Sequence, residues 1–288
     1  MFNVITRFIV LVALIIPSFN SYAAAEEITG DSQTYINTGP LIGTPTDISL
    51  HFPGINPIIG IYNAGSLNII INATSGSINS SAGDDEQADG IQSFGDSNII
   101  TNTGTITATT GVSGDSEGIK SQGDSNTISN FGNINAAGDN RKATGIYSYG
   151  DSNALTNSGT INATAGYSGA AYGIQSYGNN NTITNSGTIN ATAGDFGTAY
   201  GISSFGDGTT ISNSGIITAT GGNFAFGIQF YGGNNNTITN SGTITATKGI
   251  LGGTAYGISS GGDGTTINNS GIITATGGDG YGATGIYL

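Results

Sequence analysis

Residues 173–192 read Gly173-Ile-Gln-Ser-Tyr-Gly-Asn-Asn-Asn-Thr-Ile-Thr-Asn-Ser-Gly-Thr-Ile-Asn-Ala-Thr192, and close variants recur about every 28 residues. The Gly-Ile pair marks the period, with glycines at Gly60, Gly90, Gly118, Gly145, Gly173, Gly201, Gly227, Gly257 and Gly285. Self-similarity at this period is typical of stacked repeats rather than of a globular core. The repeat therefore predicts a solenoid array over residues 60–288.

Three apolar landmarks recur inside each repeat. The second follows the isoleucine of Gly-Ile by nine residues, with one exception of ten, and the third comes six residues later in all seven complete repeats. The return to the next Gly-Ile takes 11 to 14 residues. Polar and apolar residues alternate around each landmark, which is the pattern of β-strands. We predict an all-β fold, a right-handed parallel β-helix with about 28 residues and three short strands per rung.

Two further columns mark the tight corner between the second and third strands. Asn stands two residues after the second landmark, where its amides can stack from rung to rung, at Asn102, Asn130, Asn157, Asn185, Asn213, Asn240 and Asn269. Gly follows two residues later, where we expect it to supply a positive φ, at Gly104, Gly132, Gly159, Gly187, Gly215, Gly242 and Gly271.

The segment before the array has a different composition. It holds all five prolines of the chain, Pro17, Pro40, Pro45, Pro53 and Pro57. An interior strand donates every N–H to a neighbour and proline has none to give, so an array without proline is consistent with stacked strands. We predict that residues 26–59 form an irregular N-terminal cap, which includes the lone histidine, His51.

Residues 1–25 have the features of a secretory signal peptide. Arg7 precedes an apolar run, Phe8 to Ile16, that is too short to cross a bilayer, and small residues surround Ala23 and Ala25. We expect cleavage after one of these alanines. The sequence therefore predicts an exported protein whose mature chain has no membrane span.

Composition excludes several classes of partner. The chain has 18 acidic and 5 basic residues and a net charge of −13, so it lacks the basic surface that nucleic acid requires. It has no Cys, which leaves neither disulfides nor thiolate metal sites. We predict no catalytic residue, no metal and no cofactor, because His51 stands alone and no repeat departs from the pattern to build a site.

The repeat at residues 173–192 resembles the repeats of β-helical passenger domains in bacterial autotransporter proteins, the type V secretion family. The resemblance covers residues 60–288. It implies display at the cell surface, commonly as an adhesin, and an outer-membrane barrel if the chain continues beyond Leu288. The expected function is that of a non-enzymatic surface or secreted adhesin or structural protein, with a host or surface glycan or a protein receptor as partner.

Two other functions stay open. Some parallel β-helices are polysaccharide lyases or hydrolases, whose chemistry needs paired carboxylates. Carboxylates do recur here in Gly-Asp turns, where we expect them to cap their own backbone rather than hold calcium, at Asp96, Asp124, Asp151, Asp207 and Asp263. The third strand also presents threonines in register, for example Thr105, Thr107 and Thr109, an array that resembles ice-binding solenoids.

An aromatic column supplies the candidate contact surface. Its members lie three residues after the Gly-Ile isoleucines, an odd offset that points them out of the core. They are Phe94, Tyr149, Tyr177, Phe205 and Tyr231. Such rings can cover one another or stack on sugars and partner chains. We take this column as the predicted binding site.

Overall fold

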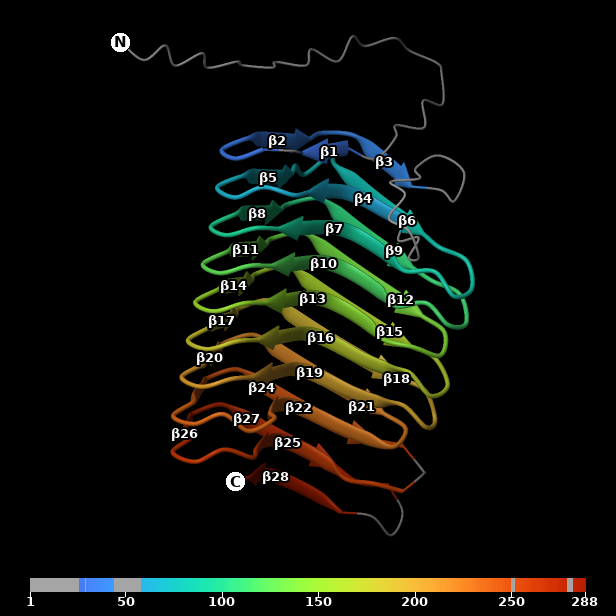
Figure 1. Cartoon of the computed structure of the whole chain (residues 1–288). Coiled ribbons are helices and arrows are strands. Elements are labelled where there is room, and N and C mark those ends of the chain that lie inside the picture. The colour runs from blue at the N-terminus through green and yellow to red at the C-terminus, as the bar shows by residue number, and fades with distance from the viewer. Residues whose placement is uncertain (1–25, 29, 44–57, 250–251, 279–281) are drawn as a thin grey trace, which may run out of the picture.

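The computed structural model describes residues 26–28, 30–43, 58–249, 252–278 and 282–288, so the predicted signal peptide and His51 lie outside it. The chain winds into stacked rungs that run from the N-terminal to the C-terminal end of a rod (Figure 1). These residues form 28 strands and no helix. They accordingly include no helix of the length and apolarity needed to cross a membrane.

The strands build three parallel sheets, each of which takes one strand from every rung. Sheet A contains β1 (Glu26–Ile28), β4 (Ile58–Asn63), β7 (Ala88–Phe94), β10 (Ser116–Gln122), β13 (Ala143–Tyr149), β16 (Ala170–Tyr177), β19 (Thr198–Phe205), β22 (Phe224–Phe230), β25 (Ala255–Ser260) and β28 (Ala283–Tyr287). Sheet B contains β2 (Thr34–Asn37), β5 (Ile69–Asn72), β8 (Ile99–Asn102), β11 (Thr127–Asn130), β14 (Ala154–Asn157), β17 (Thr182–Asn185), β20 (Thr210–Asn213), β23 (Thr237–Asn240) and β26 (Thr266–Asn269). Sheet C contains β3 (Pro40–Gly43), β6 (Ser77–Ser81), β9 (Thr105–Thr109), β12 (Asn133–Gly138), β15 (Thr160–Ala165), β18 (Thr188–Ala193), β21 (Ile216–Gly221), β24 (Thr243–Lys248) and β27 (Ile272–Thr276).

The register follows the sequence repeat. Ile146 pairs with Ile174 in sheet A, and Asn157 pairs with Asn185 in sheet B. Each strand therefore lies against the strand that occupies the same place in the next repeat. The prediction of an all-β parallel β-helix with three strands per rung and about 28 residues per turn is confirmed.

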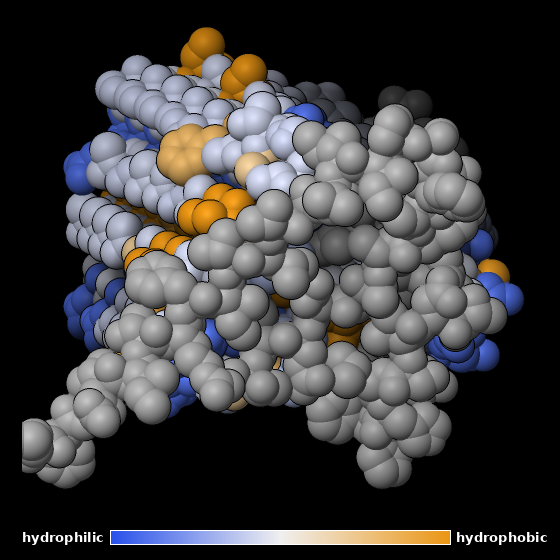
Figure 2. All heavy atoms as spheres, turned by 90° about the horizontal axis from the view of Figure 1, so that it is seen from above, coloured by the Kyte–Doolittle hydropathy of each residue, from blue (hydrophilic) through white to orange (hydrophobic). Residues whose placement is uncertain are grey.

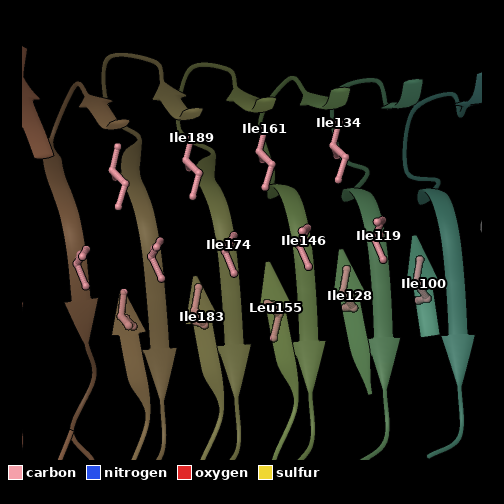
Figure 3. Packing of buried hydrophobic residues seen from close by; sticks show 14 of the residues in the cluster. Ile100, Ile119, Ile128, Ile134, Ile146, Leu155, Ile161, Ile174, Ile183 and Ile189 are labelled. Carbon is pink, nitrogen blue, oxygen red and sulfur yellow. The ribbon is translucent and has the colours of Figure 1, made fainter. Parts of the chain in front are cut away.

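Most strands of a rung contribute one isoleucine to the core, which also includes Leu155, Phe230 and a second cluster of buried alanines. The three landmarks of one repeat, Ile174, Ile183 and Ile189, are fully buried and stack on the equivalent residues of the neighbouring rungs (Figure 3). Burying one such side chain contributes roughly 1.5–3 kcal/mol, whereas ordering a whole rung costs far more. A single rung cannot be stable alone, so stability depends on contacts between neighbouring rungs.

The outer surface is mainly polar. Seen from the N-terminal end, the visible flanks of the rod are mostly blue or pale and run in regular rows, with hydrophobic atoms in small patches between them (Figure 2). This matches the strand pattern, in which Thr, Ser and Asn alternate with buried isoleucine and alanine.

The predicted asparagine column forms a buried hydrogen-bonded ladder. The Nδ2 of each asparagine donates to the Oδ1 of the next, over distances of 2.7 to 2.8 Å. The ladder runs through Asn37, Asn72, Asn102, Asn130, Asn157, Asn185, Asn213, Asn240 and Asn269. Stacking of the amides is therefore confirmed, and the ladder begins two rungs before the first predicted member.

We expect Asn157→Leu to destabilise the rod by about 3 kcal/mol, because both neighbours, Asn130 and Asn185, lose a buried hydrogen-bond partner. The measurement is urea denaturation followed by circular dichroism. Asn269→Leu is the control, since that residue is exposed and bonds to only one other asparagine. Equal losses of unfolding free energy in both variants would show that the hydrogen bonds between asparagines of successive rungs add nothing to the stability of the turn itself.

The glycine column has a different cause from the one predicted. Gly104, Gly132 and their equivalents do not have positive φ, so that expectation is wrong. They pack against the backbone of the preceding rung instead. A Cβ added at Gly132 would lie 2.0 Å from the carbonyl oxygen of Gly104, and one at Gly187 would lie 2.1 Å from that of Gly159. Glycine is required here for close approach between rungs.

The predicted irregular cap over residues 26–59 is also wrong where the structure describes it. Strands β1, β2 and β3 extend the three sheets by one rung, and β4 begins within this segment at Ile58. Asn37 and Gly39 repeat the Asn-x-Gly spacing of the later corners. Pro40 fits because it is the first residue of β3, an edge strand of sheet C.

Candidate binding face on sheet A

The three outer faces of the rod differ in chemistry. The outer face of sheet C presents the predicted threonine array, interrupted by Ile216 and Ile272, whose side chains are 48% and 61% exposed. Sheet B presents mainly Thr and Ser. Aromatic rings and the ion pairs concentrate on sheet A, so this face is the candidate functional surface.

The predicted aromatic column lies on sheet A and is continuous over only part of its length. Tyr177 stacks on Phe205 at 4.4 Å between ring centroids, and Phe205 stacks on Tyr231 at 4.6 Å, with nearly parallel planes. Tyr149 is 6.1 Å from Tyr177 and tilted by 38°. Within the stack, the ring faces that meet one another are covered and are not available to a ligand.

Phe94 is separated from the other members of the predicted column. Gln122 lies between Phe94 and Tyr149 in the register of sheet A. The Phe94 ring instead meets Tyr62 edge-on at 5.8 Å. The structure therefore unites four of the five predicted residues and leaves Phe94 apart.

A second aromatic stack was missed by the sequence analysis. Tyr172, Tyr200, Phe226 and Tyr256 stack with centroid distances of 4.6 to 5.1 Å and interplanar angles of 5° to 6°. The hydroxyls of Tyr200 and Tyr231 are in hydrogen-bond contact, which joins the two stacks. The signal was the repeated motif Ala-Tyr-Gly-Ile or Ala-Phe-Gly-Ile. The ring lies two residues before the isoleucine, so strict alternation would point it into the core. The glycine between them is left out of the strand pairing, and the ring therefore points outward.

A hollow opens at the N-terminal end of the first stack. It has a volume of about 410 Å³ and is lined by Asp124, Tyr149, Gly150, Asp151, Tyr177 and Gly178. Tyr149 is 55% exposed, and its neighbour in the preceding rung is Gln122 instead of a ring. Gly150 and Gly178 have no side chains that could fill the space. The hollow therefore combines an exposed ring with two carboxylates.

The carboxylates belong to a corner ladder, formed by Asp96, Asp124, Asp151, Asn179, Asp207, Asn234 and Asp263. In it, the Oδ1 of each residue except Asp263, the last, accepts the backbone N–H of its equivalent in the next rung, at 2.6 to 3.2 Å. The expectation that these aspartates cap their own backbone is wrong, because the bond spans two rungs. Among the described residues, no group of three or more Asp, Glu, His or Cys side chains could hold a metal ion.

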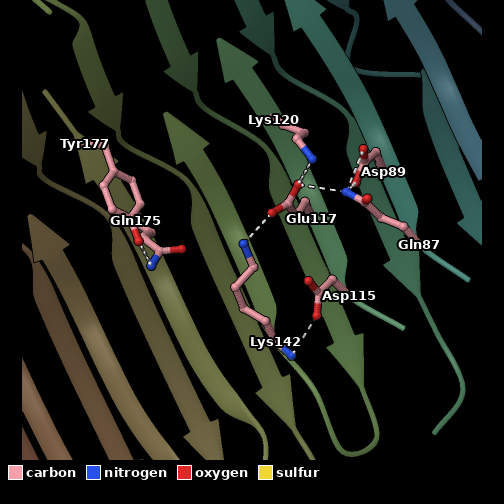
Figure 4. A network of polar contacts seen from close by, with 8 residues as sticks. All are labelled: Gln87, Asp89, Asp115, Glu117, Lys120, Lys142, Gln175 and Tyr177. Atoms are coloured by element: carbon pink, nitrogen blue, oxygen red, sulfur yellow. Dashed lines mark hydrogen bonds and ion pairs between the residues drawn. The ribbon is translucent and has the colours of Figure 1, made fainter. Parts of the chain in front are cut away.

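A buried polar cluster lies on sheet A toward the N-terminal end, and sequence analysis did not identify it. Glu117 is 2% exposed and pairs with Lys142 at 2.5 Å and with Lys120 at 2.9 Å. Gln87 Nε2 donates to Glu117 at 3.1 Å and to Asp89 at 2.9 Å (Figure 4). Lys142 also lies over the ring of Tyr147, with Nζ 4.4 Å from the centroid. The cluster joins three successive rungs.

The two acids of this cluster differ in charge state. Burial, followed by the repulsion of Glu117, raises the pKa of Asp89 to about 8. Burial also opposes ionisation of Glu117, but Lys142 and Lys120 outweigh it and hold the pKa of Glu117 below its usual value. At neutral pH the cluster thus contains one carboxylate, one protonated carboxyl group and two lysines.

The raised pKa of Asp89 predicts a specific pH dependence. The fold retains a proton that an unfolded aspartate, with a pKa of 3.8, releases. This contribution to stability is complete below about pH 4 and is lost as the pH rises toward 8, by up to about 1.4 kcal/mol per pH unit. Asp89→Asn removes the titrating carboxyl group and keeps an oxygen that accepts from Gln87. The unmodified protein should lose stability between pH 4 and pH 8 through Asp89, and the variant should not.

Urea denaturation at pH 4, 6 and 8 measures this difference. The two proteins are expected to be closest in stability at pH 4 and to diverge as the pH rises. Parallel stability curves over the whole range would contradict the assignment of a neutral Asp89.

Comparisons of the chain with protein families, with curated proteins and with solved structures give no match.

Proposed function

We propose that this protein is an exported, non-enzymatic rod, displayed or released at the cell surface in the manner of an autotransporter passenger, that acts as an adhesin by binding glycans. The contact site is the hollow on sheet A between Tyr149 and Tyr177. The observation that carries the proposal is the exposed Tyr149 ring beside two carboxylates in a hollow of about 410 Å³.

Ring geometry decides which part of the aromatic column can bind. Phe205 is covered on both faces, and Tyr177 and Tyr231 are each covered on the face that meets Phe205. A pyranose stacks its apolar C–H face on an aromatic ring face, which demands an uncovered ring. Tyr149 is tilted out of the stack and has no ring on its other side. It is the member of the column that best suits a sugar.

The charge of the chain narrows the class of glycan. A net charge of −13 repels sulfated and uronic acid polymers and leaves neutral or cationic sugars as favourable partners. Lys120 and Lys142, which lie on the same face, are both paired with Glu117.

The alternative of a glycan-cleaving enzyme has less support. A glycosidase needs one carboxyl group as an acid and a second as a base or nucleophile. Asp124 and Asp151 instead both hold the corner ladder through Oδ1 and are exposed. Among the described residues, the carboxyl group with a strongly raised pKa is that of Asp89, which is buried in the ion-paired cluster.

The test is to incubate the mature chain with a panel of immobilised neutral, amino and acidic glycans and to assay the same glycans for cleavage. We expect saturable binding to neutral or amino sugars, no binding to sulfated polymers and no new reducing ends. Turnover of any glycan would replace the adhesin with an enzyme. Absence of binding across the whole panel would remove the glycan-binding function.

A further inference from the structure

We propose that the sugar bound in the hollow carries a protonated amine, so that the ligand is a glycan containing unacetylated hexosamine. In this arrangement the ammonium group binds Asp124 and Asp151 while the sugar ring stacks on Tyr149. The inference rests on the proposed glycan-binding function and adds the chemical class of the ligand.

The first support is that both carboxylates keep a free oxygen. Asp124 Oδ1 accepts the N–H of Asp151 at 2.8 Å, and Asp151 Oδ1 accepts the N–H of Asn179 at 2.6 Å. Within the described part of the chain, the Oδ2 atoms of both residues accept no hydrogen bond. Two anionic oxygens on adjacent rungs therefore remain beside an exposed ring, and they can accept two of the three ammonium protons.

The second support is that the ladder does not need a negative charge at these positions. Asn179 and Asn234 fill the same role in other rungs, where their Oδ1 atoms accept the N–H of Asp207 and Asp263 at 2.9 and 3.2 Å. A neutral amide would hold the corner at Asp124 and Asp151 equally well. The carboxylates are thus free to serve a ligand, and their mutual repulsion falls when a cation binds between them.

The third support is the combination of charge and ring. A cation held beside a tyrosine ring and a carboxylate gains from both, since the ring face is electron-rich and the carboxylate accepts a charge-assisted hydrogen bond. Within the described residues, the ion pairs of Lys120 and Lys142 are both with Glu117, and neither lysine pairs with Asp124 or Asp151. An N-acetylated sugar would stack on Tyr149 but would leave both carboxylate oxygens without a cationic partner.

Calorimetric titration with two probes, a glucosamine tetramer and its fully N-acetylated counterpart, tests the inference at pH 6. We expect the amine form to bind the mature chain roughly ten- to hundred-fold more tightly. Asp151→Asn, which preserves the ladder acceptor, should abolish that preference. Asp207→Asn, which removes the same charge from the ladder beside covered rings, should leave it intact.

Each outcome decides the matter. Equal binding of both tetramers would overturn the amine assignment, because the ammonium groups would then contribute nothing to affinity. Equal losses in Asp151→Asn and Asp207→Asn would also overturn it, because only general charge attraction would remain. The proposed function would survive that result if other glycans of the panel bind. Failure of both tetramers would also overturn the amine assignment, and failure of every glycan would overturn both proposals.

Discussion

A Gly187→Ala variant is expected to lose about 3 kcal/mol of unfolding free energy, a large share of what a typical domain has. The new Cβ would lie 2.1 Å from the carbonyl oxygen of Gly159. Gly187 donates to Asn157 in the preceding rung, and the following Thr188 donates to the same Gly159 carbonyl, so the corner cannot move outward without breaking these bonds. Urea denaturation followed by circular dichroism measures the effect.

Gly39→Ala is the matched control for that experiment. Gly39 occupies the same place in the first described rung, but no atom of the described residues lies within 4 Å of a Cβ added there. Its φ is not positive, so alanine introduces no backbone strain. We expect the control to keep its stability. A Gly187→Ala variant as stable as Gly39→Ala would contradict the close packing of the glycine column.

The fold could be predicted from the sequence because every rung repeats the same information. The period of about 28 residues and the constant spacing of the three landmarks define which strands pair. A shift of the pairing by one residue would move all the isoleucines of a strand to the outside, so only one strand register buries them. The asparagine ladder followed from the same logic. Its amides fall at equal positions in successive rungs, and each is both donor and acceptor.

The errors arose where contacts between rungs decide the conformation. The glycines at the Asn-x-Gly corner were explained by local φ, whereas the neighbouring backbone excludes a side chain. The first rung was missed because its prolines suggested irregular structure, although Asn37 and Gly39 carried the corner signal. The aspartates of the corner ladder satisfy the next rung rather than their own, and no pattern within one repeat reveals this.

The candidate site could be predicted only in part. The offset from isoleucine placed Tyr149, Tyr177, Phe205 and Tyr231 on one outer face. Sequence spacing could not say which ring stays uncovered, because that depends on tilts within the stack and on the substitution of Gln122 for a ring. The buried cluster around Glu117 was not foreseen either, since its members come from three different rungs.

Tyr149→Ala is expected to weaken glycan binding by roughly 100-fold, as removal of a central aromatic anchor does at other binding sites. The ring supplies the uncovered face of the hollow, whereas Tyr177 is covered on one face by Phe205. Stability should change little, since this side chain is 55% exposed. The measurement is calorimetric titration with the tightest-binding oligosaccharide from the glycan panel.

Phe131→Ala provides the control for Tyr149→Ala. Phe131 is also 55% exposed, but it lies at the corner between sheets B and C, between β11 and β12. Its removal takes away an exposed ring without altering the hollow, so binding should remain as in the unmodified protein. If both variants lose affinity equally, adhesion depends on general surface aromaticity and the hollow is not the site.

Hydroxyl-radical footprinting of the mature chain, with and without that oligosaccharide, tests the central claim most directly because it compares every exposed ring in one experiment. Tyr149 and Tyr177 should be protected by the ligand. Phe131, Tyr167 and Phe196, whose exposed fractions are 55%, 57% and 50%, should react as in the free protein. Protection of any of these three with Tyr149 still reactive would place the binding site elsewhere on the rod and contradict the account.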